Sequence, residues 1–170
     1  MTNETLYLGA NPLNASATAV EGDYVTRDGE SFYRIANVDG MNDFFISVVS
    51  DSNHWMFIST RGGLSAGRTD CDSALFPYYT EDKIRDNSDN TGSRTIVIAD
   101  QGGKRMLWEP FSRSHTGIYR ITRNLYKNVL GDKLIFEETN HDLGLQFSYS
   151  WSTSDRFGFV KQSTIKATGN

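Results

Sequence analysis

The chain has 170 residues, of which 38% are hydrophobic and 12% aromatic. This content suffices for one buried core and excludes an intrinsically disordered chain. Seventeen basic and 21 acidic residues give a net charge of −4, which argues against nucleic-acid binding that depends on neutralising phosphates. The sequence contains no apolar stretch of about 18 residues, so we expect no membrane contact through a spanning helix.

The residue types favour an all-β domain. Nine Ala and seven Glu stand against 17 Ser, 15 Thr, 14 Asp and 12 Asn, so strand and turn residues outnumber good helix formers. Residues 1–22 are rich in small residues and are interpreted as an extended lead-in with at most a short edge strand. Residues 23–170 are expected to form one antiparallel β-sandwich domain.

Short apolar runs separated by turn residues recur from residue 24 onward. Asp28-Gly29 and Asp39-Gly40 are hairpin signals, because both residue types tolerate positive φ. The pattern predicts a meander of ten or eleven strands, closed as a sandwich or barrel. The expected strands cover 24–27, 31–38, 43–50, 54–60, 74–79, 93–99, 104–109, 117–127, 132–139, 143–152 and 157–166, with a helical turn over 81–85.

Three of these strands carry information about layers. Large apolar residues alternate with small or polar ones from Leu143 to Trp151, which predicts one buried and one wet face. The runs 44–49 and 95–98 are apolar at consecutive positions, so we expect cover on both of their faces.

Residues 104–133 carry seven basic and two acidic side chains with interleaved aromatics. We interpret them as a solvated face of a β-strand with salt bridges rather than a surface that binds single-stranded nucleic acid.

No residue pattern indicates catalysis or a metal site. Cys71 lies between Asp70 and Asp72, and two neighbouring carboxylates oppose thiolate formation. Glu137 and Glu138 are adjacent on a predicted strand, so they point to opposite faces and cannot flank one glycosidic bond. The histidines are scattered without metal-ligand spacing, and the Asp- and Asn-rich loops lack the calcium-loop pattern. We therefore assign no catalytic residue and no metal ligand.

Parts suited to carbohydrate binding are present on the expected loops. Flat aromatic rings and planar polar groups are what a sugar-binding loop needs. The chain offers them at Trp55, Tyr78, Tyr79, Trp108, Phe111, Arg61, Arg68, Asp70 and Asp72. Arg61-Gly62-Gly63 lacks the Lys-Ser/Thr ending of a phosphate loop, so its glycines are interpreted as a hairpin turn.

The order of short motifs resembles one known family. The motifs are Phe44–Ser50, Arg61–Arg68, Ala74–Tyr79, Arg94–Ile98, Trp108-Glu109-Pro110-Phe111 and a run of strands ending at Ile165. Together they resemble the N-terminal β-supersandwich domain of cellobiose and chitobiose phosphorylases (glycoside hydrolase family 94), which has a galactose-mutarotase-like fold. The chain departs from that family at residues 123–128, where a His-Gly-x-Gly-Tyr-like stretch is usual.

The resemblance implies a non-catalytic domain of a carbohydrate-active enzyme acting on β-linked disaccharides, which shapes the active site and pairs subunits. The catalytic helical domain of the parent chain, a disaccharide or oligosaccharide, and a second copy of the chain would be its partners. The domain itself would need no cofactor, while inorganic phosphate would be the parent's co-substrate.

With the resemblance, five residues become the expected sugar contacts. Arg61 and Arg68 would donate bidentate hydrogen bonds, Asp70 and Asp72 would accept from hydroxyls, and Tyr78 would stack on a ring. A lone cysteine and the lack of a signal-peptide pattern favour the cytoplasm. The alternatives are a free-standing carbohydrate-binding module and a purely structural dimerisation domain.

Overall fold

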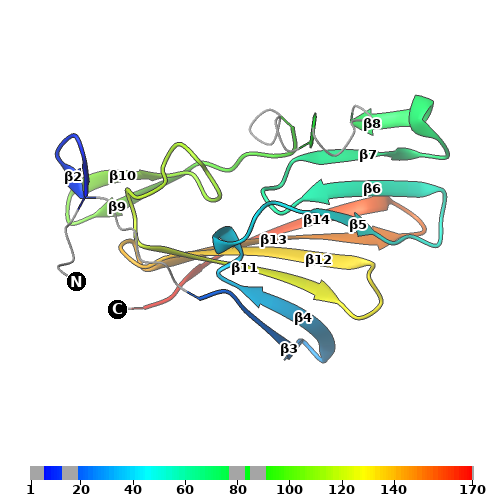
Figure 1. Ribbon diagram of the computed structural model, residues 1–170, viewed down its shortest axis with the longest axis horizontal. Helices are drawn as coiled ribbons and strands as arrows, with labels where there is room; N and C mark the ends of the chain where they lie inside the picture. The colour runs from blue at the N-terminus through cyan, green and yellow to red at the C-terminus, as the bar shows by residue number, and fades with distance from the viewer. Residues whose placement is uncertain (1–5, 13–18, 77–82, 85–90, 170) are drawn as a thin grey trace.

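The computed structural model describes residues 6–12, 19–76, 83–84 and 91–169, and antiparallel strands make up most of them (Figure 1). Two sheets form the sandwich, one of six strands in the order β14-β13-β12-β11-β4-β3 and one of four in the order β5-β6-β7-β8. Two further hairpins, β1-β2 and β9-β10, form small sheets of their own. The all-β antiparallel sandwich expected from the sequence is therefore confirmed.

The bounds of the elements are as follows. The strands of the six-stranded sheet are β3 (Glu21–Arg27), β4 (Glu30–Ala36), β11 (Ile121–Asn128), β12 (Lys133–Asn140), β13 (Leu145–Ser154) and β14 (Gly158–Ala167). The four-stranded sheet contains β5 (Phe45–Val48), β6 (His54–Ser59), β7 (Leu64–Arg68) and β8 (Ala74–Phe76). The remaining elements are β1 (Tyr7–Leu8), β2 (Asn11–Pro12), β9 (Val97–Gln101), β10 (Lys104–Trp108) and the 3-10 turns η1 (Val38–Gly40) and η2 (Cys71–Ser73).

The core lies between the two sheets and follows the alternation along β13. Phe147 and Tyr149 are buried, and the intervening serines point to the other face because successive side chains of a strand alternate. The ring of Tyr149 stacks on that of Phe136 with 4.7 Å between centroids. From the other sheet, Met56 and Ile58 belong to the same buried cluster. The predicted buried face of this strand is confirmed.

One predicted hairpin is correct and one is wrong. Asp28 and Gly29 both have positive φ, 50° and 80°, and join the paired strands β3 and β4. Around Asp39-Gly40, by contrast, the chain forms η1 and crosses from β4 in one sheet to β5 in the other. The same two residue types serve a tight hairpin in the first case and a sheet-to-sheet connection in the second.

Strand β7 has no counterpart among the predicted strands. Its residues are small (Leu-Ser-Ala-Gly-Arg), and the sequence pattern left them unassigned after the glycine turn. Tertiary packing explains the strand: Ser65 is fully buried, and a Cβ on Gly67 would lie 2.5 Å from the Trp55 ring. Small side chains are required here because neighbouring groups fill the space, which local propensity does not reveal.

Cover on both faces was expected for two runs and is only partly present. Ile46 and Val48 are buried, but Val49 is 52% exposed. Ile96, just before β9, and Ile98 on β9 are 63% and 67% exposed, although Trp108 at the end of the β9-β10 hairpin is buried. The expectation of two-sided cover for 95–98 is therefore wrong, because this hairpin belongs to neither main sheet.

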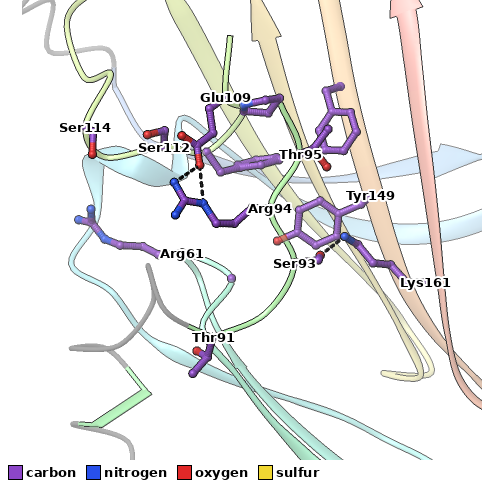
Figure 2. A pocket seen from close by; sticks show the side chains of 14 residues that line it. Arg61, Thr91, Ser93, Arg94, Thr95, Glu109, Ser112, Ser114, Tyr149 and Lys161 are labelled. Atoms are coloured by element: carbon purple, nitrogen blue, oxygen red, sulfur yellow. Dashed lines mark hydrogen bonds and ion pairs between the residues drawn. The ribbon is translucent and has the colours of Figure 1, made fainter. Parts of the chain in front are cut away.

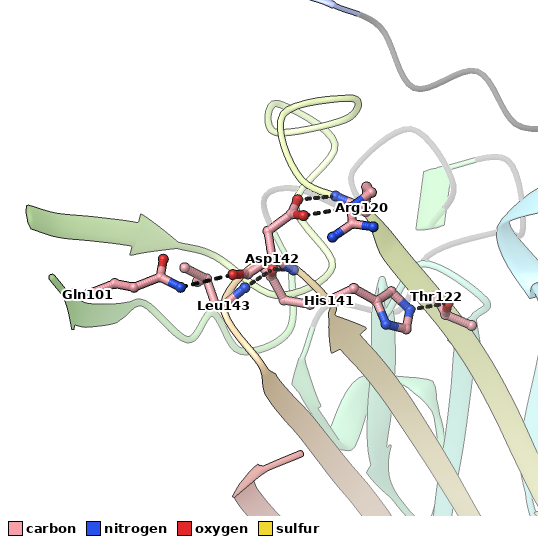
Figure 3. A network of polar contacts seen from close by, with 7 residues as sticks. Gln101, Arg120, Thr122, His141, Asp142 and Leu143 are labelled. Carbon is pink, nitrogen blue, oxygen red and sulfur yellow. Dashed lines mark hydrogen bonds and ion pairs between the residues drawn. The ribbon is translucent and has the colours of Figure 1, made fainter. Parts of the chain in front are cut away.

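One hydrogen bond joins the β9-β10 hairpin to the β12-β13 turn, and further bonds order the turn itself (Figure 3). Gln101 donates a side-chain bond to the Asp142 carbonyl (3.1 Å). The Asp142 carboxylate accepts bonds from the backbone N–H of Arg120 (2.7 Å) and from its guanidinium (2.6 Å). The fully buried Asn140 caps the turn by accepting from the N–H groups of residues 142 and 143.

Several predicted boundaries differ from the structure. The strand expected over 117–127 begins only at Ile121, because the preceding residues form turns. The strand expected over 74–79 is seen as Ala74–Phe76, and the rest lies outside the described residues. Of the helical turn expected over 81–85, the structure describes only Lys83 and Ile84, which are helical. No helix in the described part of the chain has the length and apolarity needed to cross a lipid bilayer.

Candidate functional site

A polar pocket of about 180 Å³ opens at one end of the sandwich (Figure 2). Its floor comes from the inner face of the large sheet, with Phe147 and Tyr149 on β13 and Lys161 on β14. Three connecting segments form its rim: the β6-β7 turn, the segment before β9 and the loop after β10. The rim residues are Arg61, Gly62, Thr91, Ser93, Arg94, Thr95, Glu109, Pro110, Phe111, Ser112 and Ser114.

A buried carboxylate holds the loop that follows β10. Glu138 on β12 is 1% exposed, and its Oε1 accepts a hydrogen bond from the indole N–H of Trp108 (2.8 Å). Its Oε2 accepts bonds from the backbone N–H of Phe111 (2.7 Å) and from Arg123 Nε (2.7 Å). The loop at the pocket rim is thus tied to a carboxylate buried within the core.

Phe111 adopts a backbone conformation that a bulky residue rarely takes. Its φ is 65°, in the left-handed region, and such strain persists only where surrounding contacts enforce it. Besides the bond to Glu138, the Phe111 ring makes edge contacts with Phe136, Phe147 and Tyr149 at centroid distances of 6.2, 6.2 and 5.3 Å. The loop is therefore locked at this residue, as expected of a preorganised binding wall.

Two glycines let the rim segments approach one another. Gly62 and Gly92 have φ values of 84° and 87°. A Cβ on Gly92 would lie 2.7 Å from the Gly62 carbonyl oxygen, and one on Gly62 would lie 2.9 Å from the Tyr149 hydroxyl. Only glycine combines this backbone conformation with such close packing.

Three cations line the pocket, and two of them have carboxylate partners. Arg94 binds Glu109 through Nε (2.7 Å) and Nη2 (2.5 Å). Arg61 binds Asp43 at 2.5 Å. Figure 2 shows the Arg94–Glu109 pair in the centre of the view, with Arg61 to one side and Lys161 to the other. Among the described lining residues, Glu109 is the single carboxylate.

Lys161 differs from both arginines. Its ammonium donates a hydrogen bond to the Ser93 hydroxyl and lies 4.5 Å from the centroid of the Tyr149 ring, within cation–π range. No ion pair joins it to a carboxylate within the described part of the chain. Burial lowers the pKa of Lys161 below its ordinary value and raises the pKa of Tyr149, since both charged forms lose hydration here.

Hydroxyl groups supply most of the remaining polar surface of the pocket. Thr91 accepts a bond from the N–H of Leu64 (3.2 Å), which ties two rim segments together. The side-chain hydroxyls of Thr95, Ser112 and Ser114 make no protein hydrogen bond among the described residues. Each hydroxyl can donate and accept, so the pocket offers several adaptable partners to a polar ligand.

The structure separates the sequence-predicted sugar contacts. Arg61 lies on the pocket rim. Arg68, Asp70 and Asp72 lie at the opposite end of β7, because β6 and β7 pair from His54–Arg68 to Ile58–Leu64. Tyr78 lies outside the described residues. The predicted residues therefore do not form one cluster around Arg61.

The polar residues of the β7-β8 loop stabilise the loop itself. The Asp70 carboxylate caps η2 by accepting from the N–H of Ser73 (3.0 Å), and the Asp70 carbonyl accepts from the Trp55 indole (3.0 Å). Thr69 before it has a left-handed φ of 60°. Cys71 is exposed and forms no disulfide.

Sequence reasoning missed most of the pocket. Lys161, Arg94 and Tyr149 come from strands and segments far apart in the chain. One usable signal was Lys161, a charged residue two positions after Phe159 within the alternating pattern of β14. A cation at an inward position of a strand indicates either a ligand or protection of a sheet edge.

Neither a protein-family model nor a curated protein matches this sequence. The resemblance to the sandwich domain of glycoside phosphorylases stays a prediction.

Proposed function

We propose that this β-sandwich is a non-catalytic carbohydrate-binding domain. We propose further that the pocket next to the loop that follows β10 (the β10 loop) binds one sugar unit. The single observation that carries this proposal is the lining itself. Three hydroxyls that make no hydrogen bond within the described part of the chain, a charged pair and the aromatic Tyr149 surround a cavity of about 180 Å³. Sugars present many hydroxyls in fixed directions, and such ligands are held by a few placed polar groups beside an aromatic surface.

The size of the pocket limits the ligand. Drug-sized sites span roughly 300–1,000 Å³, so a cavity of about 180 Å³ accepts a monosaccharide unit and not a long chain. A disaccharide would place its second ring outside the rim, next to Arg61. This arrangement suits an accessory domain that holds one end of a sugar.

The parent enzyme is part of the proposal. Following the family resemblance, we propose that the domain belongs to a glycoside phosphorylase or a related enzyme acting on β-linked disaccharides in the cytoplasm. There it would pair with a catalytic helical domain and help two subunits associate. Inorganic phosphate would be the co-substrate of that catalytic domain.

Titration with glucose, cellobiose and chitobiose, followed by amide chemical shifts, tests binding. We expect the largest shifts at the lining residues, within 61–62, 91–95, 109–114, 147–149 and at 161. Tyr149→Phe removes a hydroxyl that has no protein hydrogen bond among the described residues. It should leave stability nearly unchanged and weaken binding about three- to tenfold, the value of one hydrogen bond.

Tyr126→Phe is the matched control. Tyr126 lies on the outer face of the same sheet, where its hydroxyl donates to Glu137 (2.7 Å). This variant should lose stability and keep sugar affinity, the reverse of Tyr149→Phe. If no sugar shifts the pocket amides at millimolar concentration, or if both variants lose affinity equally, the proposal is refuted.

Subunit pairing is the second candidate function. An apolar cavity of about 430 Å³ lies between β5 and the strands β3, β4 and β11. It is lined in part by Tyr24 and Tyr33, which are 76% and 42% exposed, and exposed aromatic surface is typical of contact regions. If a second copy covers it, Tyr24→Ser should shift sedimentation from dimer to monomer without changing sugar affinity.

A further inference from the structure

The charge balance of the pocket points to a more specific ligand, and this step rests on the proposed function. We infer that the sugar carries an oxyanion group, such as the carboxylate of a uronic acid, and that Lys161 binds it. Arg94 and Arg61 are neutralised by Glu109 and Asp43. Among the lining residues that the structure describes, Lys161 is the remaining cation, and its partners there are a hydroxyl and an aromatic ring.

The setting of Lys161 makes its charge available to a ligand. The side chain extends from β14 across the floor of the pocket toward Ser93 (Figure 2). Its position pairs with Trp151 on β13, which places it on the inner face of the sheet together with Tyr149. An ammonium in such a place loses hydration, and a cation–π contact replaces only part of it. A bound oxyanion would supply the missing counter-charge.

Lys161 can also be explained as a charge that protects the edge of the sheet, and this explanation predicts a different result. β14 is an edge strand of the six-stranded sheet, and inward charges on edge strands protect sheets against pairing with other chains. If protection were the sole role, replacing Lys161 would promote self-association and leave every ligand affinity unchanged. The two explanations are therefore separable by experiment.

The test measures the affinities of glucuronate, glucose and inorganic phosphate by calorimetry, for the native chain and three variants. Lys161→Gln keeps a side chain able to bond Ser93 but removes the charge. Lys166→Gln removes the same charge from the same strand at an exposed, outward position. Lys161→Arg restores the charge. Circular dichroism and urea unfolding establish that each variant is folded.

We expect the native chain to bind glucuronate about tenfold more tightly than glucose, the effect of one charge-assisted hydrogen bond. Lys161→Gln should bring the ratio of glucuronate to glucose affinity close to one, and Lys161→Arg should restore most of the preference. Lys166→Gln should bind like the native chain. Equal affinity for glucuronate and glucose in the native chain, or a preference that survives in Lys161→Gln, overturns the inference.

The three ligands also separate this inference from the proposed function. If glucose binds and glucuronate gains nothing, the sugar pocket stands and the role of Lys161 fails. If phosphate binds through Lys161 as tightly as glucuronate and glucose does not bind, the anion site stands and the sugar pocket fails.

Discussion

Removing the charge of Glu138 should destabilise the chain far more than removing the charge of its neighbour Glu137. The two residues are adjacent on β12, and both side chains are less than a tenth exposed. They point to opposite faces, Glu138 into the core and Glu137 outward. The same substitution, Glu→Gln, can thus be compared at two sites with matched burial and different partners.

At Glu138 the carboxylate uses both oxygens. Oε1 accepts from Trp108, while Oε2 accepts from Phe111 and Arg123. A glutamine has one accepting oxygen, so its amide must face one of these N–H donors, and Arg123 loses its counter-charge. Breaking a buried pair on one side costs about 3–5 kcal/mol. Because Arg123 also bonds the Ser112 carbonyl (3.2 Å), we expect the lower end, about 3 kcal/mol.

At Glu137 the loss should be smaller. Tyr126 and Asn124 donate to Oε1 (2.7 and 3.1 Å), and a glutamine oxygen there keeps both bonds. Arg27, at 3.1 Å from Oε2, is 27% exposed and can turn to water. We expect Glu137→Gln to cost about 1 kcal/mol.

Urea unfolding followed by circular dichroism, with unchanged slopes, gives both free energies. Glu138→Gln should also shift the amide signals of residues 109–112, since the loop loses its anchor. Equal losses for the two variants, or a loss below about 1 kcal/mol for Glu138→Gln, would refute the assignment of Glu138 as the group that holds the pocket rim.

Two further perturbations probe the supports of the pocket. Partial burial alone would raise the pKa of Asp142, but hydrogen bonds from Arg120 outweigh it and bring the pKa below 3.8. A lowered carboxyl pKa adds stability that is present above the unfolded value and lost as pH falls through the folded value. Asp142→Asn should therefore lower the free energy of unfolding by roughly 1 kcal/mol near neutral pH. Urea titrations should show the difference between the native chain and the variant disappearing below about pH 3.8. A difference that stays the same in acid contradicts this explanation. Gly92→Ala should cost about 1–2 kcal/mol more than Gly29→Ala. Both glycines have positive φ, but a new Cβ would contact the Gly62 carbonyl at Gly92 and would have open space at Gly29. Equal losses of stability in the two variants would show that the rim backbone shifts at little cost to accept the Cβ.

The strands that the sequence predicts best are those whose pattern and tertiary environment agree. β13 alternates apolar and small residues, and its apolar side chains do face the core. Asp28-Gly29 closes a hairpin because the two strands it joins lie next to each other. β7 fails this test, since its small residues are selected by the Trp55 ring packed on Gly67 and not by strand propensity.

Sheet order and the pocket escaped prediction for a related reason. A meander predicts contacts between consecutive strands, but β4 pairs with β11 across a long stretch of chain. The pocket arises from that long-range arrangement, because β13 and β14 meet the β6-β7 turn and the β10 loop only after both sheets have assembled. Of the five expected sugar contacts, Arg61 reached the pocket because a glycine turn placed it at an open end of the sandwich.

The adjacent acids on β12 show how one strand can serve both stability and a binding site. The sequence already indicated that Glu137 and Glu138 could not act together on one bond, because they face opposite ways. What it could not show is that the core-facing acid would be charged among aromatic rings and still fully hydrogen-bonded. Burying an ion costs several kcal/mol unless its partners are fixed, and here one of those partners is the backbone N–H of the strained Phe111. An apolar residue would remove that cost, but it would leave the Trp108 indole, the Phe111 N–H and Arg123 without the acceptor that they share. We attribute the buried carboxylate at this position to its bond with the Phe111 N–H, because that bond joins β12 to the loop at the pocket rim.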